Sequence, residues 1–182
     1  VLIDCAEKLI EGEFIQIRAN NTLMTIDYYM EVIEKKTAVL FSGILHCLGI
    51  YSKQNQENID HLRDLGLSFG KAFQLNDDLA DFNDSSSTGK AKFKDLDEGK
   101  LTFPILIVLK EMSQQEQAEF KGRINSKDFI AIKGQINERG GFEKTRAERD
   151  DAIDNCIEYT SKFIKLDNLD NMKKFLRNTL LA

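Results

Sequence analysis

Apolar residues recur every three or four positions along almost the whole chain, and no useful stretch alternates apolar and polar residues. This period matches the 3.6 residues of a helical turn, so the pattern predicts helices from end to end. Only one proline, Pro104, stands among the 182 residues, which fits long helices because proline breaks a helix in its interior. We therefore expect an all-α helical bundle that forms a single domain over residues 1–182.

The pattern also predicts where the first helices lie. We expect them over residues 1–18, 25–51 and 59–82, followed by a polar loop over residues 83–100. Residues 38–50, AVLFSGILHCLGI, are apolar on nearly every side, which predicts a helix buried in the middle of the bundle. A loop as long as 83–100 in a compact domain is usually functional or disordered.

Capping signals place the later helices. Thr102-Phe103-Pro104 predicts the start of a short helix, because proline is favoured at the first helical position. Ser113 and Glu116 form a capping-box pattern, and Gly140-Gly141 predicts the end of the helix after that one. Two further helices complete the chain.

Composition excludes several classes of function. The formal net charge of -5 argues against nucleic-acid binding, which needs clustered lysine and arginine. Cys5, Cys47 and Cys156 are too far apart for a disulfide framework or a zinc site, which favours the cytoplasm. The sequence contains no long apolar span and no signal peptide, so we expect a soluble protein. It begins inside a helical pattern without a methionine, and we expect further residues before Val1.

One helical face in the third helix gathers small and acidic residues. At 100° per residue, a single arc of about 120° holds six of them. They are Gly66, Gly70, Gln74, Asp77, Asp78 and Asp81. Carboxylates this close repel each other unless they are solvated or bridged by a cation, and oxygen ligands suit Mg²⁺. The glycines allow a neighbouring group or a ligand to approach closely. The alternative is a solvated acidic face.

A second copy of the same spacing, Asp150-Asp151-x-x-Asp154, lacks the glycines and the glutamine and follows a charged run. We interpret that copy as surface charge.

Three lysines are candidates for binding an anion. Lys36, followed by Thr37, stands where the second helix becomes apolar, and a buried lysine is costly unless it meets an anion. The alternative is that Lys36 reaches the surface through its long side chain. Lys90 and Lys100 lie in the loop after the acidic face, where they could fold over a phosphate group or remain solvated.

Four segments, in their order along the chain, resemble the trans-type polyprenyl diphosphate synthase family. YYMEVIEKKTAVLF is similar to the family's Lys-Thr helix, and GKAFQLNDDLADF to its second aspartate-rich motif. TGKAKFKDLDEGKLTFPIL is similar to the lysine loop that follows, and GEFIQIR to the segment that precedes these motifs. The resemblance implies a helical bundle of the isoprenoid synthase type. It also implies an enzyme that elongates an allylic diphosphate with isopentenyl diphosphate and releases diphosphate.

The resemblance implies roles for individual residues. Asp77, Asp78 and Asp81 would bind Mg²⁺, the cofactor of the family. Lys36, Lys90 and Lys100 would contact the allylic diphosphate, Thr37 and Gln74 would position the reacting groups, and Phe73 would line the substrate pocket. The family is typically a homodimer, and a long apolar helix would suit such an interface. The loop DLDEGKLTFP is more similar to long-chain synthases than to farnesyl diphosphate synthases, which implies a product of medium or long chain length.

The sequence departs from the family in one respect. No segment before Leu65 matches the family's first aspartate-rich motif or its arginines for isopentenyl diphosphate. We therefore expect that the chain is the C-terminal part of a longer synthase and that these residues alone have little or no activity. The alternatives are a non-catalytic partner subunit of a heteromeric synthase and a terpene cyclase, whose second metal motif differs from NDDLAD.

Overall fold

The computed structural model describes residues 1–18, 24–83, 93–163 and 166–181, and in these ranges every regular element is a helix. The elements are α1 (Leu2–Arg18), α2 (Ile26–Ile33), η1 (Glu34–Ala38), α3 (Val39–Tyr51), α4 (Gln56–Ala80), α5 (Lys94–Asp97), α6 (Phe103–Leu109), α7 (Gln114–Asn125), α8 (Phe129–Glu138), α9 (Gly141–Ser161) and α10 (Leu166–Leu181). The expected all-α fold is confirmed. None of the described helices combines the length and the apolar character needed to cross a membrane.

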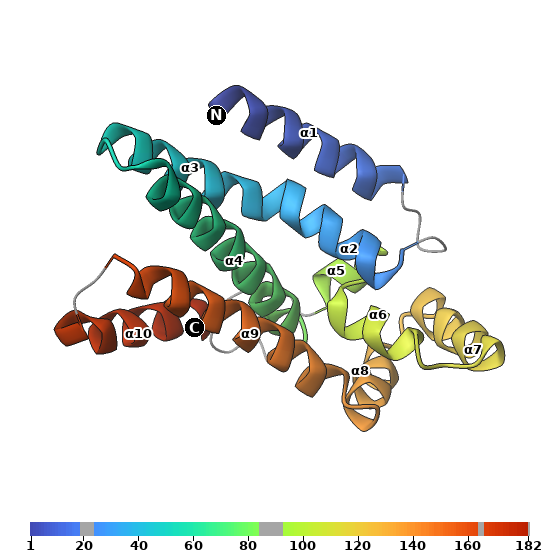
Figure 1. Ribbon diagram of the computed structural model, residues 1–182. Helices are drawn as coiled ribbons and strands as arrows, with labels where there is room; N and C mark the ends of the chain where they lie inside the picture. Colours follow the sequence, from blue (N-terminus) through green and yellow to red (C-terminus); the bar gives the residue numbers. More distant parts are fainter. Residues whose placement is uncertain (19–23, 84–92, 164–165, 182) are drawn as a thin grey trace.

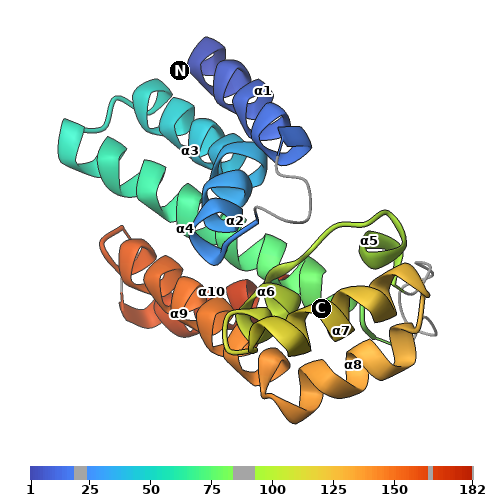
Figure 2. The same cartoon turned by 90° about the vertical axis from the view of Figure 1, so that its right-hand side faces the viewer.

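Helix α4 is the central element of the fold. It packs against α3 on one side and α9 on the other, while α1 lies beside α3 and α10 beside α9 (Figure 1). The shorter helices α7 and α8 lie side by side at the end of the molecule farthest from α1 (Figure 2). This arrangement places α4 between the helices that precede it in the chain and those that follow it. The acidic face lies on the C-terminal half of α4.

Two glycines let α4 approach its neighbour at backbone distance. A Cβ atom at Gly66 would lie 2.4 Å from the Cα of Ser42, and one at Gly70 would lie 2.3 Å from the Cα of Ala38. Real Cβ atoms do not come this close to another backbone, so any larger residue would force the helices apart. The expected close approach is confirmed, and the neighbouring group is a helix.

The second helix covers residues 26–51 without a break, close to the expected range of 25–51, but its hydrogen-bond pattern changes along the way. Thr25 caps α2 by accepting a hydrogen bond from a backbone N–H, but the ladder then widens into the π-helix η1, Glu34–Ala38. Gly12 of α1 packs on this turn, since a Cβ there would lie 2.7 Å from the backbone nitrogen of Lys36. Short π-helical turns occur often at functional sites, because the extra residue redirects the side chains around it. Here the turn contains the Lys-Thr pair.

The prediction that residues 38–50 are buried on nearly every side is wrong for one face of α3. The face toward α4 is buried, but the opposite face is exposed in the part of the chain that the structure describes. The side chains on that face are half or more exposed: Leu40, Ile44, Leu48 and Tyr51. Apolar patches of this kind commonly mark interaction surfaces.

The main core lies around α6, the short apolar helix. Pro104 stands at its start as expected, and Ile105 and Val108 are fully buried within it. The capping box of Ser113 and Glu116 at α7 is confirmed, and so is the helix end before Gly140, which adopts a left-handed conformation. The short helix α5 was not expected, because it lies within the polar loop predicted over residues 83–100.

Candidate active site

A cavity of about 500 Å³ opens between α1, α2, η1, α4 and the segment that joins α5 to α6. Seven charged side chains of the described residues line it: Glu13, Lys36, Asp77, Asp78, Asp95, Glu98 and Lys100. Five of these are carboxylates and two are ammonium groups, so the wall is negative overall when all are ionised. Such a wall repels a polyanion unless cations accompany it.

Lys36 and Thr37 project from the π-helical turn into this cavity. The Nζ of Lys36 donates to the Oε1 of Gln16 at 2.5 Å and forms an ion pair with the Oε2 of Glu13 at 2.7 Å. The hydroxyl of Thr37 donates to the Oε1 of Gln74 at 3.0 Å. Two α1 side chains therefore hold the lysine, while Thr37 connects η1 to α4.

Asp78 is fully buried at the centre of the site and is bonded through both oxygens. Its Oδ2 accepts from the Tyr29 hydroxyl and from the backbone N–H of Phe103 at 3.1 Å, and its Oδ1 accepts from the Nε2 of Gln74 at 3.2 Å. Burial raises the pKa of Asp78 to about 7, although these hydrogen bonds favour the charged form. Burial also raises the pKa of Tyr29 well above its usual value, with the charge of Asp78 adding to the effect.

Asp77 and Asp81 flank Asp78 on the same end of α4. Asp77 lines the cavity and is partly exposed. The Oδ1 of Asp81 accepts from the backbone N–H groups of Lys94 at 2.9 Å and Asp95 at 3.4 Å, whereas its Oδ2 is buried without a hydrogen-bond partner among the described residues. The pKa of Asp81 is raised, first by burial and then by the negative charge of Asp95. A cation would relieve both costs.

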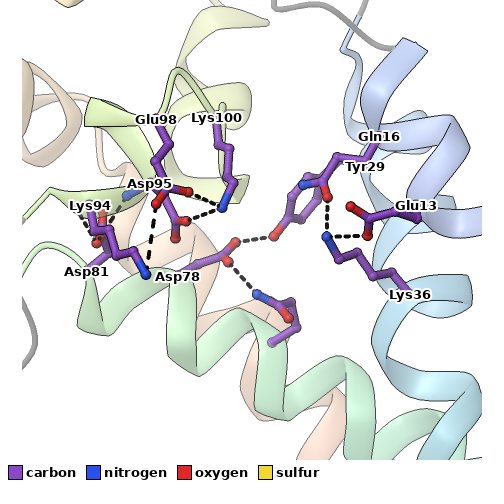
Figure 3. A network of polar contacts seen from close by, with 11 residues as sticks. Glu13, Gln16, Tyr29, Lys36, Asp78, Asp81, Lys94, Asp95, Glu98 and Lys100 are labelled. Carbon is purple, nitrogen blue, oxygen red and sulfur yellow. Dashed lines mark hydrogen bonds and ion pairs between the residues drawn. The ribbon is translucent and has the colours of Figure 1, made fainter. Parts of the chain in front are cut away.

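Lys100 lies across the cavity from Lys36. Figure 3 shows the two lysines on opposite sides of Asp78, with Lys100 held by Asp95 at 3.2 Å and by Glu98 at 2.6 Å. Hydrogen bonding to Glu98 is the main reason that the pKa of Lys100 is raised. The third predicted lysine, Lys90, lies outside the described residues.

The carboxylates fit a magnesium ion only if the ion also takes ligands from elsewhere. No three acidic, histidine or cysteine side chains of the described chain converge closely enough to hold a metal alone. Mg²⁺ does not need three, because it commonly takes one or two carboxylates, several waters and substrate phosphate oxygens. The buried, unpaired Oδ2 of Asp81 and the carboxylate of Asp77 suit this coordination.

Phe73 and the second acidic copy lie apart from the cavity. Phe73 is 45% exposed, does not line the cavity, and packs its ring on that of Phe41 at a centroid distance of 5.7 Å. Its role in the pocket stays a prediction. Asp150, Asp151 and Asp154 are all exposed on α9, which confirms their interpretation as surface charge.

Sequence reasoning missed four of the residues that complete the site. Glu13 and Gln16 lie in the GEFIQIR segment, whose spacing gave no sign that they face Lys36. Asp95 stood in the long loop and carried no helical pattern. Tyr29 could have been noticed only as an apolar residue seven positions before Lys36, because its bond to Asp78 depends on how α2 packs on α4.

Comparison with known proteins identifies the family. A model of the polyprenyl synthetase family matches residues 1–136. The octaprenyl diphosphate synthase of Escherichia coli (strain K12) is 32% identical over 163 residues, which cover 86% of this chain and 50% of that protein. The decaprenyl-diphosphate synthase of Dictyostelium discoideum is 31% identical over 160 residues, covering 87% of this chain and 34% of that protein. The chain thus spans about half, or less, of the length of these curated relatives.

Solved structures share the fold. A decaprenyl diphosphate synthase from Rhodobacter capsulatus superposes with a TM-score of 0.85 at 28% identity, covering 98% of this chain and 58% of that one. A polyprenyl synthase from Caulobacter crescentus CB15, complexed with calcium and isoprenyl diphosphate, superposes with a TM-score of 0.87 at 27% identity, covering 100% of this chain and 57% of that one. The family match over residues 1–136, together with this shared helical fold, establishes that the chain belongs to the polyprenyl synthetase family.

Proposed function

We propose that the chain forms the part of a prenyltransferase that binds Mg²⁺ and the diphosphate group of an allylic substrate. The observation that carries this proposal is the pair of lysines, Lys36 and Lys100, on opposite sides of a cluster of carboxylates in one cavity. A diphosphate would gain from both lysines but would be repelled by the carboxylates unless cations bridged them. The Caulobacter crescentus relative, complexed with calcium and isoprenyl diphosphate, supports this assignment.

The reaction proposed is head-to-tail elongation. The C–O bond of the allylic diphosphate breaks with departure of diphosphate, the double bond of isopentenyl diphosphate attacks the resulting allylic cation, and the new cation loses a proton. Mg²⁺ would stabilise negative charge on the departing diphosphate. Lys36 and Lys100 would bind the diphosphate oxygens, with Lys90 as a further candidate, and Thr37 and Gln74 would help to position the reacting groups.

Within the acidic motif of Asp77, Asp78 and Asp81, we propose that Asp77 and the unpaired oxygen of Asp81 contact the ion. Asp78 supports them from the buried side. We propose that the first aspartate-rich motif, which no segment before Leu65 resembles, lies outside these 182 residues and that the active unit includes it.

We further propose a product of medium or long chain length. The similarity to octaprenyl and decaprenyl diphosphate synthases supports this choice, as does the loop DLDEGKLTFP. For the assembly we propose a homodimer in the cytoplasm. The exposed apolar face of α3 would suit such an interface, and the three cysteines are all unpaired. Light scattering after gel filtration would measure the oligomeric state.

Turnover tests the proposed reaction. The full-length gene product is incubated with farnesyl diphosphate, radiolabelled isopentenyl diphosphate and MgCl₂, and prenyl products are separated by chain length. We expect elongated products that disappear with EDTA and in Asp77→Ala. Asp151→Ala is the matched control from the second acidic copy, and it should retain activity. Products formed equally in EDTA, or equal losses in the two variants, would refute the proposal.

A further inference from the structure

The segment that carries Lys100 is bonded at both ends to the acidic motif. We call residues 93–103 the lysine segment. At its start, the backbone N–H groups of Lys94 and Asp95 donate to the Oδ1 of Asp81. At its end, the backbone N–H of Phe103 donates to the Oδ2 of Asp78 at 3.1 Å. Asp78 of α4 and Asp81, which caps the C-terminus of α4, therefore hold the two ends of one connection.

The bond at the end of the lysine segment depends on a third element. The Oδ2 atom that accepts from Phe103 also accepts from the hydroxyl of Tyr29, which lies on α2 and is only 5% exposed. Gln74 bonds the other oxygen, so the carboxylate is fixed in one orientation. Asp78 thus joins α2, α4 and the start of α6 at a single buried point.

We infer that Tyr29 is a positioning residue, which orients Asp78 so that the lysine segment holds Lys100 across the cavity from Lys36. This inference rests on the proposed function, in which the two lysines bind one diphosphate. Asp78 then acts through the hydrogen bond that it accepts from the backbone N–H of Phe103, because it is fully buried and both of its oxygens are already engaged.

Removing the Tyr29 hydroxyl leaves Asp78 buried with one donor fewer. An unsatisfied buried carboxylate is costly, so we expect Asp78 to turn toward water in the cavity that it lines. The N–H of Phe103 would then lose its acceptor, and the position of Lys100 would no longer be fixed. The binding of diphosphate should weaken about 10- to 100-fold, the range expected for a hydrogen bond to a charged group.

Tyr29→Phe tests the inference, with Tyr28→Phe as the matched control. Tyr28 is the adjacent residue on α2, and its hydroxyl makes no hydrogen bond within the described part of the chain. The KM for farnesyl diphosphate and kcat are measured with Mg²⁺ in the protein as its gene encodes it. The folded fraction is measured by circular dichroism in the same samples. We expect KM to rise about 10- to 100-fold in Tyr29→Phe and to stay unchanged in Tyr28→Phe.

The same substitution in a Lys100→Ala background separates positioning from a structural role. Once Lys100 is absent, loosening its segment should raise KM by no more than about threefold further. A structural role would instead lower the folded fraction and kcat with KM unchanged. That result would overturn the inference, as would a full effect of Tyr29→Phe in the Lys100→Ala background. If the unsubstituted protein shows no magnesium-dependent turnover, the proposed function fails instead.

Discussion

Replacing Gly66 or Gly70 by alanine should destabilise the protein, although alanine is the better helix former. Added Cβ atoms would lie 2.4 Å from the Cα of Ser42 and 2.3 Å from the Cα of Ala38. The obstruction is backbone in both cases, so no side-chain rotation can relieve it. Carbon atoms pack at about 3.5 Å or more, so α4 and its neighbour must separate by about 1 Å.

The expected cost follows from two opposing terms. Overpacking of a core costs about 1–3 kcal/mol, with the upper half of that range expected where backbone must move. The higher helix propensity of alanine offsets about 1 kcal/mol of this cost. The free energy of unfolding should therefore fall by about 1–2 kcal/mol for each variant. The separation would also break the 3.0 Å hydrogen bond between Thr37 and Gln74, so activity should fall as well.

Two other helical glycines provide matched controls. A Cβ at Gly122 in α7 or at Gly134 in α8 would meet no atom within 4 Å. Alanine at either position should raise the free energy of unfolding by about 0.5–1 kcal/mol. Urea unfolding of the four variants measures the difference in sign. If Gly66→Ala and Gly70→Ala were as stable as Gly122→Ala, the close packing of α4 would be refuted.

Three further predictions concern charge and chain length. Glu116→Gln should reduce stability near neutral pH, because hydrogen bonds from Ser113 and Arg139 lower the pKa of Glu116 from 4.5 to about 2. The ionised Glu116 therefore contributes to the free energy of unfolding above about pH 4.5, and this contribution is lost as the pH falls through about 2. The stabilities of the two proteins should become equal at low pH, and a difference that stays constant with pH would contradict this prediction. Lys36→Met should weaken pyrophosphate binding in the presence of Mg²⁺ about 10- to 100-fold by calorimetry, whereas Lys53→Met, a substitution of an exposed loop lysine, should not. Residues 1–182 expressed alone should give little or no turnover of farnesyl and isopentenyl diphosphates, and efficient elongation by them would contradict the proposal that the active unit includes further residues.

The helices and the acidic face could be predicted because both depend on local periodicity. A rotation of 100° per residue is enough to place Gly66, Gly70 and Asp77 on one side of a helix, and α4 is a regular α-helix over these residues. The capping box at Ser113 was equally local. These features need no knowledge of how one helix packs on another.

The parts that could not be predicted depend on tertiary packing. Tyr29 reaches Asp78 across 49 positions of sequence, and Glu13 reaches Lys36 from another helix. The π-helical turn leaves the 3.6-residue pattern intact on either side, so periodicity cannot locate it. The exposed face of α3 was missed because an apolar composition does not distinguish a surface that meets another element of the same chain from one that does not.

Binding of inorganic pyrophosphate with and without Mg²⁺ tests most directly whether the acidic motif at Asp77 binds cations that in turn bind diphosphate. Isothermal titration of the protein as its gene encodes it should show binding in MgCl₂ and none in EDTA, and Asp77→Asn should abolish it. Equal binding in EDTA, or magnesium-dependent binding that Asp77→Asn leaves unchanged, would contradict the assignment of this cavity as the diphosphate site.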